Sequence, residues 1–272
     1  MDLEKIKKHW DGLSEVYAKD LKSTTKTPTI KKLEIAAIAQ SIKTLQEANN
    51  ISNVLEVGCG NGYNLIGLTK ELPEINFTGI DYSAGMIKNA DKLKADYNLD
   101  KIKYFEGNIL KLDENKNLEA EYDVIFTNRC LINLNTLELQ LEALANLKNK
   151  LRDNGYLVLV ENSTKTHGNQ KDCREALGLE RRVVDGYNLF LDEKKFLDYA
   201  QGDLNLELVD TVDFGSLHDM MLYVLIPKLN GGKTDYAHPL MDAVTELLLN
   251  IDPSKMGSFG DFGQNRLYLL KK

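Results

Sequence analysis

Short apolar runs alternate with amphipathic helical stretches through the middle of the chain. The runs are rich in β-branched residues and short enough to be buried strands, whereas the stretches between them repeat apolar residues every three or four positions. We expect strands over 54–57, 77–80, 102–105, 123–126 and 156–160, and helices over 64–72, 84–97 and 136–151. This alternation is typical of βαβ units, so it predicts an α/β fold with a doubly wound, mostly parallel sheet and helices on both faces.

The segments on either side of this core follow other patterns. Residues 1–50 repeat apolar positions at helical spacing and predict an N-terminal helical cap. Residues 162–204 have a looser pattern, which predicts a loop with short helices inserted over the carboxyl edge of the sheet. We therefore divide the chain into a cap (1–50), a core (51–161) and a third part (162–272) that completes the same domain as the core.

The last third of the chain completes the sheet. Residues 206–214 alternate like a strand and 266–270 predict a final strand that can run antiparallel, which brings the sheet to seven strands. The stretch 220–227 fits a strand or a helix equally well, and 239–249 predicts a helix.

Composition and charge narrow the class of protein. The chain carries 34 basic and 41 acidic residues, and this net charge of −7 argues against a general nucleic-acid binder. No apolar run approaches the ~20 residues of a membrane helix, and residues 1–10 lack the apolar core of a signal peptide. The three cysteines show no paired spacing, so we expect no metal site. These features predict a cytoplasmic protein.

Glycines recur at every second position directly after the first expected strand. The turn reads Gly58, Cys59, Gly60, Asn61 and Gly62, and a helix follows it. Glycines let the backbone pass close under a ligand without Cβ collisions, and the start of a helix supplies unpaired N–H groups. In this strand-to-helix context the turn predicts a nucleotide-binding loop, in which Cys59 is only a small residue.

Two acidic residues bracket the glycine turn and indicate which nucleotide binds. Asp81 ends the second strand, where a carboxylate can accept both ribose hydroxyls, and Glu56 precedes the first glycine by two residues. A carboxylate in this mouth would repel a diphosphate and favour a sulfonium cation that carries an ammonium group. The pattern points to S-adenosylmethionine (SAM). The simpler readings are a solvated strand end for Glu56 and a helix N-cap for Asp81.

The segment 50–161 resembles the class I SAM-dependent methyltransferases, whose fold is Rossmann-like. The glycine turn resembles their first motif, Asp81 and Tyr82 with Met86 the second, and Asn108 with Ile109 the third. Residues 122–134 resemble the fourth strand and the loop after it. The resemblance implies that SAM, and its product S-adenosylhomocysteine (SAH), contacts Glu56, Gly58, Cys59, Gly60, Asn61, Gly62, Asp81, Tyr82, Met86, Asn108, Ile109, Asn128 and Arg129. Arg129 could pair with the methionine carboxylate.

Methyl transfer to a hydroxyl needs a base to take up the proton, whereas a carboxylate or neutral amine acceptor can do without one. Base candidates must lie at the carboxyl edge of the sheet. We expect Glu161, His167 and His218 there, with Asp219 beside His218. The alternative for each histidine is a surface or hydrogen-bonded structural role.

The layout of the whole chain is similar to bacterial methyltransferases encoded with surface-polysaccharide genes. This resemblance implies O-methylation of a sugar, or of a group carried on a sugar, in capsule or lipopolysaccharide synthesis. The alternatives are a small-molecule or quinone methyltransferase and a protein that binds SAM without transferring its methyl group. A NAD-dependent enzyme is a more distant rival. We expect a small-molecule or saccharide acceptor, no nucleic-acid partner, no membrane span, and a monomer or homodimer.

Overall fold

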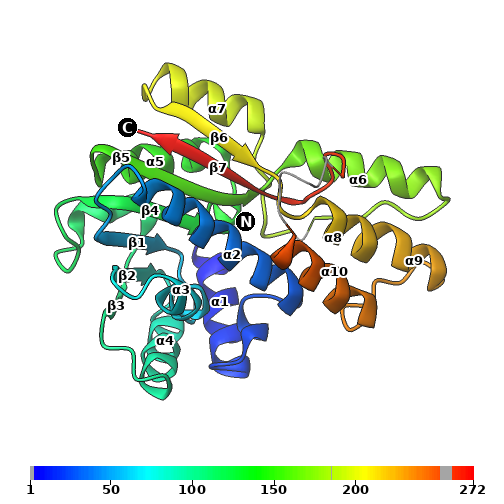
Figure 1. Ribbon diagram of the computed structural model, residues 1–272, viewed down its shortest axis with the longest axis horizontal. Helices are drawn as coiled ribbons and strands as arrows, with labels where there is room; N and C mark the ends of the chain where they lie inside the picture. The colour runs from blue at the N-terminus through cyan, green and yellow to red at the C-terminus, as the bar shows by residue number, and fades with distance from the viewer. Residues whose placement is uncertain (1–2, 185, 252–258) are drawn as a thin grey trace.

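One seven-stranded sheet organises the molecule, in the order β3-β2-β1-β4-β5-β7-β6 (Figure 1). The computed structural model describes residues 3–184, 186–251 and 259–272. The strands are β1 (Asn53–Val57), β2 (Asn76–Asp81), β3 (Ile102–Glu106), β4 (Tyr122–Asn128), β5 (Leu151–Asn162), β6 (Glu207–Val212) and β7 (Asn265–Lys271). Strands β1 to β5 pair in parallel, and β7 is antiparallel to both of its neighbours, β5 and β6. The predicted doubly wound, mostly parallel sheet is confirmed.

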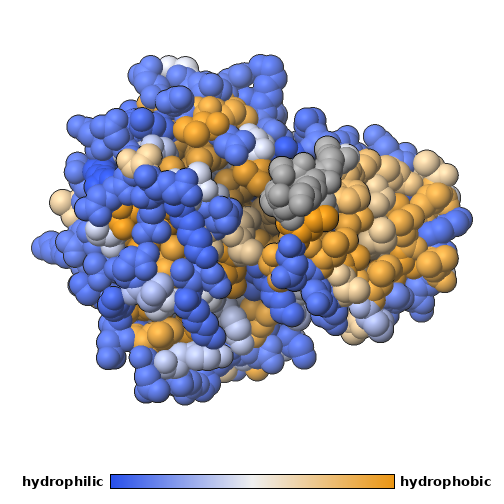
Figure 2. All heavy atoms as spheres, viewed as in Figure 1, coloured by the Kyte–Doolittle hydropathy of each residue, from blue (hydrophilic) through white to orange (hydrophobic). Residues whose placement is uncertain are grey.

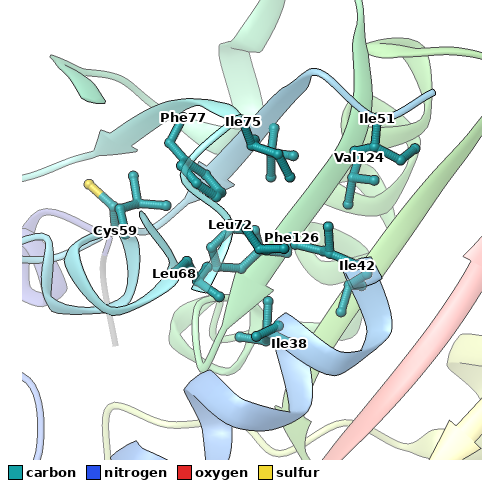
Figure 3. Close-up of a cluster of buried hydrophobic side chains, with 14 of the residues drawn as sticks. Ile38, Ile42, Ile51, Cys59, Leu68, Leu72, Ile75, Phe77, Val124 and Phe126 are labelled. Atoms are coloured by element: carbon teal, nitrogen blue, oxygen red, sulfur yellow. The ribbon is translucent and has the colours of Figure 1, made fainter. Parts of the chain in front are cut away.

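Helices cover both faces of the sheet because the buried strands present apolar side chains on both sides. Val54, Val124 and Phe126 face one layer, and Leu55 and Ile125 face the other, as the period of two in a strand requires. The first layer contains α2 (Pro28–Gln46), α3 (Tyr63–Glu71) and α4 (Ala84–Asp96), and Figure 3 shows its buried side chains. The second layer contains η2 (Ile109–Glu114), α5 (Leu137–Asn149) and α7 (Glu193–Gly202).

The remaining helices frame the carboxyl ends of the parallel strands. α1 (Leu3–Tyr17) packs beside α4, the short η1 (Leu21–Ser23) packs beside α1, and η3 (Leu131–Asn133) follows β4. α6 (Thr164–Ala176), α8 (Ser216–Met220), η4 (Met221–Leu225), α9 (Ile226–Leu229) and α10 (Pro239–Asn250) form a lobe at the opposite end of the molecule from β3 (Figure 1).

Two segments of the chain fold differently from what the sequence predicted. The ambiguous stretch 220–227 is helical, because Leu222 and Ile226 pack against Met241 of α10 instead of extending a sheet. The segment 162–204 contains two full helices, α6 and α7, where we expected a loop with short helices. α6 has a largely polar sequence, so its apolar periodicity is weak, and its clearest local signal is the Ser163 N-cap, whose hydroxyl accepts from the Thr166 N–H.

Apolar side chains also reach the surface of this lobe. Figure 2 shows them gathered over α9 and α10, where Leu229 and Leu247 are exposed. Within the described ranges, none of the helices combines the length and the apolar character that crossing a bilayer requires.

Candidate functional site

A cavity of about 620 Å³ lies at the carboxyl ends of the parallel strands. Its walls include the turn after β1, the ends of β2 and β4 and the loop after β3, together with side chains from α1 and α2 and from the loop that follows α6. In doubly wound sheets ligands bind at this edge, where the strand order reverses, which happens here between β1 and β4.

The glycine turn forms the floor of the cavity with a backbone that only glycine adopts easily. Gly58, Gly60 and Gly62 have φ angles of +78°, +53° and +84°. A Cβ atom on Gly58 would lie 2.5 Å from the Cys130 Sγ, and one on Gly62 would lie 2.5 Å from the Tyr104 hydroxyl. Glycine at positions 58 and 62 therefore lets the turn pack directly against these two side chains, and Gly58 and Gly60 line the cavity.

The two residues between the glycines line the same cavity without offering a nucleophile. Burial raises the pKa of the Cys59 thiol well above its ordinary value, so the thiol stays neutral. The Asn61 amide donates to the backbone carbonyls of Ala18 and Asp20, which ties the turn to the segment after α1. Its Oδ1 atom is buried and has no hydrogen-bond partner in the described part of the chain.

Asp81 also lines the cavity and is held in a fixed orientation. Its Oδ2 accepts from the Gly60 N–H at 2.8 Å and its Oδ1 from the Ser83 N–H at 2.9 Å. The N-cap of α4 is Ser83, whose hydroxyl accepts from the Met86 N–H, so the simple capping role considered for Asp81 belongs to its neighbour. Tyr82 and Met86 line the cavity beside it. Each oxygen of Asp81 keeps a lone pair for a ribose hydroxyl.

The residues expected after β3 and β4 reach the cavity as well. Asn108, Ile109, Asn128 and Arg129 all line it. The Asn108 Oδ1 already accepts from the Leu110 N–H at 2.9 Å, which leaves one lone pair for an adenine amino group. Arg129 has a φ of +57°, and its Nε lies 3.1 Å from a carboxylate oxygen of Glu34 on α2.

Glu56 and Gly62 do not line the cavity. The expectation of a Glu56 carboxylate in the mouth is wrong, because its side chain is fully buried and its Oε1 accepts from the Asn64 amide at 2.5 Å. Burial raises the pKa of Glu56 to about 8, so the group is largely neutral at pH 7. Of the two expected anions, Asp81 alone therefore faces the ligand.

Two of the three base candidates are also sealed away from the cavity. The fully buried Glu161 carboxylate accepts from the Thr127 hydroxyl at 2.7 Å and from the Cys130 and Leu131 N–H groups at 3.0 Å each. The His218 ring is fully buried between the Thr29 hydroxyl and the Asp219 carboxylate, at 2.9 Å from each. Glu161 thus holds the loop after β4 in place, and neither side chain is positioned to contact an acceptor.

His167 does line the cavity, beside Phe190. Burial, together with the nearby charges of Arg182 and Lys171, lowers the pKa of His167 to about 4, so its imidazole is neutral at pH 7. Asp219 reaches the cavity too, although His218 behind it does not.

Sequence reasoning missed Arg182, which lies in the loop after α6 and lines the cavity. Its guanidinium lies 3.5 Å from the centre of the Tyr223 ring, and its Nη1 donates to the side-chain oxygens of Gln170 and Gln264 at 2.8 and 2.9 Å. Within the described ranges it forms no ion pair with an acidic side chain. No local motif marks Arg182, because its contacts come from elements far apart in the sequence.

Aromatic residues of the N-terminal cap form another wall. His9 stacks on Tyr187 with ring centres 4.2 Å apart, and Trp10 lies edge-on to the same ring. All three line the cavity. The described residues include no group of three or more side chains suited to bind a metal ion.

A family model for a methyltransferase domain matches residues 48–200. A malonyl-[acyl-carrier protein] O-methyltransferase of Halalkalibacterium halodurans is 24% identical over 204 residues, which cover 73% of this chain and 73% of the relative. The enzyme of the same name from Bacillus anthracis is 32% identical over 111 residues, which cover 41% of this chain and 38% of the relative.

Solved structures share the fold. The plantazolicin methyltransferase BamL, in complex with a triazolic desmethylPZN analogue and SAH, superposes with a TM-score of 0.56 at 16% identity and covers 100% of this chain and 99% of its own. Magnesium protoporphyrin IX methyltransferase from Synechocystis, with bound SAH, has a TM-score of 0.55 at 12% identity and covers 89% of this chain and 83% of its own.

Proposed function

The chain belongs to the methyltransferase-domain family and is a SAM-dependent methyltransferase, and from this premise we propose that it methylates a carboxylate oxygen of a small organic acid or acyl group. The observation that carries the proposal is Arg182, a cavity-lining cation without an acidic partner among the described residues.

The cofactor end of the cavity fits SAM. The glycine turn gives the nucleoside close contact with the backbone, Asp81 would accept the ribose hydroxyls, and Met86 with Ile109 would cover the adenine. When bound, SAM supplies a methyl group activated by positive sulfur. The protein's own contribution is to align the acceptor with it, an effect worth on the order of 7–11 kcal/mol for well-oriented reactants.

The acceptor end suits a carboxylate for two reasons. A guanidinium can bind a carboxylate through two parallel hydrogen bonds, and Gln170, Gln264 and Tyr223 hold that of Arg182 in place. A carboxylate needs no base, which agrees with the exclusion of Glu161 and His218 from the cavity. The curated relatives are named malonyl-[acyl-carrier protein] O-methyltransferases. That name gives an acyl group as the substrate and oxygen as the atom that receives the methyl group.

A second candidate is methylation of a hydroxyl, as in the sugar or sugar-linked acceptor that we expected from the sequence. His167 favours it, because this residue lines the cavity with a neutral imidazole that can accept a proton. The curated relatives reported above carry the name of a different substrate and lend the saccharide no support.

Turnover with carboxylate and hydroxyl acceptors tests the proposal. Formation of SAH is measured with malonyl thioesters, simple carboxylic acids and hydroxyl-bearing sugars as acceptors. Because a hydrogen bond to a charged group is worth about 1.5–3 kcal/mol, Arg182→Ala should lower kcat/KM for a carboxylate acceptor about 10- to 150-fold and leave the KM for SAM unchanged. Arg181→Ala is the matched control, since Arg181 is exposed and pairs with the surface acids Asp172 and Glu175.

Two results would contradict the carboxylate proposal. One is an unchanged rate in Arg182→Ala. The other is turnover of hydroxyl acceptors alone, with loss of that turnover in His167→Ala, which would favour the second candidate.

A further inference from the structure

Two opposite charges line the acceptor end of the cavity without pairing with each other. Arg182 lies in the loop after α6, Asp219 lies in α8, and both line the cavity. Asp219 is buried, and no salt bridge joins it to Arg182 within the described ranges. Arginine and carboxylate side chains readily pair through two parallel hydrogen bonds. The separation of these two charges is therefore a specific feature of the site.

Two glutamines hold Arg182 and Asp219 apart, and each of them bridges one charge to the other. The Gln170 Oε1 accepts from the Arg182 Nη1 at 2.8 Å, and its Nε2 donates to the Asp219 Oδ2 at 3.3 Å. The Gln264 Oε1 accepts from the same Nη1 at 2.9 Å, and its backbone N–H donates to the same Oδ2 at 2.7 Å. Neutral amides therefore set the spacing between the charges and leave both charges in place.

The amide of Gln170 is fixed in one orientation. Its side chain is fully buried, and its Nε2 also donates to the Phe262 carbonyl. A reversed amide would aim its NH2 group at the Arg182 cation and its oxygen at the Asp219 carboxylate, so hydrogen bonds would be replaced by repulsion. Gln170 thus keeps its acceptor toward the cation and its donor toward the anion.

Asp219 keeps one acceptor position for a ligand. Its Oδ1 lies 2.9 Å from the His218 Nδ1, and since a carboxylate only accepts, this nitrogen carries the proton. The other ring nitrogen of His218 is used by the Thr29 hydroxyl, also at 2.9 Å. A carboxylate offers about four lone pairs, and His218, Gln170 and Gln264 use three of those of Asp219. The remaining lone pair is on Oδ1.

The cavity-lining groups nearest to the two charges are neutral. Burial lowers the pKa of His167 to about 4, and Phe190 lies beside its ring. Burial raises the pKa of the Tyr223 hydroxyl, and the Tyr223 ring lies under the Arg182 guanidinium. Arg182 and Asp219 shift the pKa values of both His167 and Tyr223, in opposite directions, so both charges act on the same part of the cavity. A ligand there meets one cation and one anion.

We propose that the acceptor is a dipolar organic acid, such as an amino acid, whose carboxylate binds Arg182 and whose ammonium group binds Asp219. The inference rests on the carboxylate-methylation proposal and narrows its substrate class. A carboxylate oxygen gives an electron pair to the methyl carbon of SAM, and the electron pair of the broken carbon–sulfur bond stays on sulfur. The products are a methyl ester and SAH, and no proton is released. Gln170 and Gln264 are positioning residues in this pocket.

Calorimetric titration of the full chain saturated with SAH tests the pocket without turnover. The probes are glycine, β-alanine and 4-aminobutanoate, and each is paired with the acid of the same chain length that lacks the amino group: acetate, propionate and butanoate. At least one amino acid should bind about tenfold more tightly than its partner, because only the amino acid gives Asp219 a charged hydrogen-bond donor.

Asp219→Asn should remove this preference, because the amide that replaces the carboxylate is neutral. The dissociation constant of the preferred amino acid should rise about tenfold, whereas its amine-free partner should bind no more weakly than it binds the wild type. Asp242→Asn, at an exposed position of α10, is the matched control and should change neither. The affinity for SAH should be the same in Asp219→Asn and the wild type, which separates the acceptor from the cofactor's own ammonium and carboxylate groups.

Three results would overturn the proposal. Equal affinity of the wild type for the amino acids and their partners would show that no ammonium subsite exists, and this comparison needs no variant. Equal weakening of both kinds of probe in Asp219→Asn would leave Asp219 a purely structural role. Loss of SAH affinity in Asp219→Asn would assign the pocket to the cofactor. Selective binding of an amino acid without methylation of any carboxylate would support the dipolar pocket and contradict the carboxylate-methylation proposal alone.

Discussion

Three buried glutamates show how neighbours set the chemistry of one residue type. Burial by itself raises the pKa of Glu34, but Arg129 and Lys31 outweigh it and lower the pKa below the ordinary value. Glu56 and Glu161 form no ion pair within the described ranges, and burial raises their pKa values to about 8 and about 7. Glu34 is therefore a fixed anion. The other two carboxyl groups stay protonated at pH values well above the ordinary pKa of a glutamate side chain.

Glu161 should make the cofactor-free protein less stable as the pH rises. Its pKa is about 7 in the folded state against an ordinary 4.5, so its contribution is fully present below pH 4.5 and is lost as the pH rises through 7. The full effect is about 3 kcal/mol. Urea unfolding between pH 5 and pH 8 should therefore show a shallower fall in the free energy of unfolding for Glu161→Gln than for the wild type.

Glu142→Gln, on the exposed face of α5, is the control for this titration and should keep the wild-type pH dependence. If Glu161→Gln followed the wild-type curve throughout, the protonated Glu161 of the folded state would be disproved.

At the scale of single residues, the sequence predicted which side chains carry the chemistry better than it predicted which of them are buried. Asp81 and Arg129 could be placed at the ligand edge because Asp81 ends β2 and Arg129 directly follows β4, and the apolar residues of each strand predict where that strand lies. We expected Glu161 directly after the fifth strand, but it lies within β5. Backbone N–H groups of the loop after β4 bind its carboxylate, and no spacing within the sequence predicts that contact.

The strand–turn–helix unit made by β1, the glycine turn and α3 shapes the cofactor end of the cavity. Gly60 has a φ of +53°, and a Cβ at this position would lie 2.7 Å from the Thr24 Cγ2. A β-branched side chain strongly disfavours this backbone conformation.

Gly60→Val should therefore abolish SAH binding, with at least a 100-fold loss in calorimetry, while circular dichroism still reports the wild-type helix and strand content. Gly168→Ala is the matched change, because Gly168 lies in α6 with no neighbouring atom within 4 Å of the added Cβ. It should be neutral or stabilise the protein by up to about 1 kcal/mol. Wild-type affinity in Gly60→Val would separate the turn from the ligand.

The helices and strands that could be predicted from the sequence are those whose apolar residues repeat at a clear spacing. The buried strands β1 to β5 lie where the sequence has its β-branched runs. The final strand β7 is antiparallel to β5, which the long connection before it allows. The stretch 220–227 remained open in the sequence because a short apolar run fits a buried strand and a buried helix equally well. Its helical form depends on α10, which lies later in the chain.

On the scale of the whole molecule, the cavity should distinguish a positively charged ligand from a diphosphate. Asp81 lines the cavity beside the glycine turn, whereas Glu56 is buried and does not line it. A diphosphate at this turn would meet a carboxylate, whereas a sulfonium would be attracted to it.

SAM at about 100 times its dissociation constant should stabilise the folded protein by about 2.7 kcal/mol, visible as a rise of several degrees in Tm. NADH at the same concentration should leave Tm unchanged, because the Asp81 carboxyl group at the turn leaves no room for its diphosphate's charge. Protection by NADH without protection by SAM would reverse this ranking of ligands.

The position of β7 in the chain has a consequence for synthesis on the ribosome. Asn265 at the start of β7 binds Glu34, and Gln264 before it binds Arg182, so both ends of the cavity depend on residues translated after all the other described elements. A nascent chain with six strands already outside the exit tunnel still lacks these supports. In a translation product that stalls before β7 both supports are absent, so we expect it to bind the ligand weakly even when the cofactor is abundant.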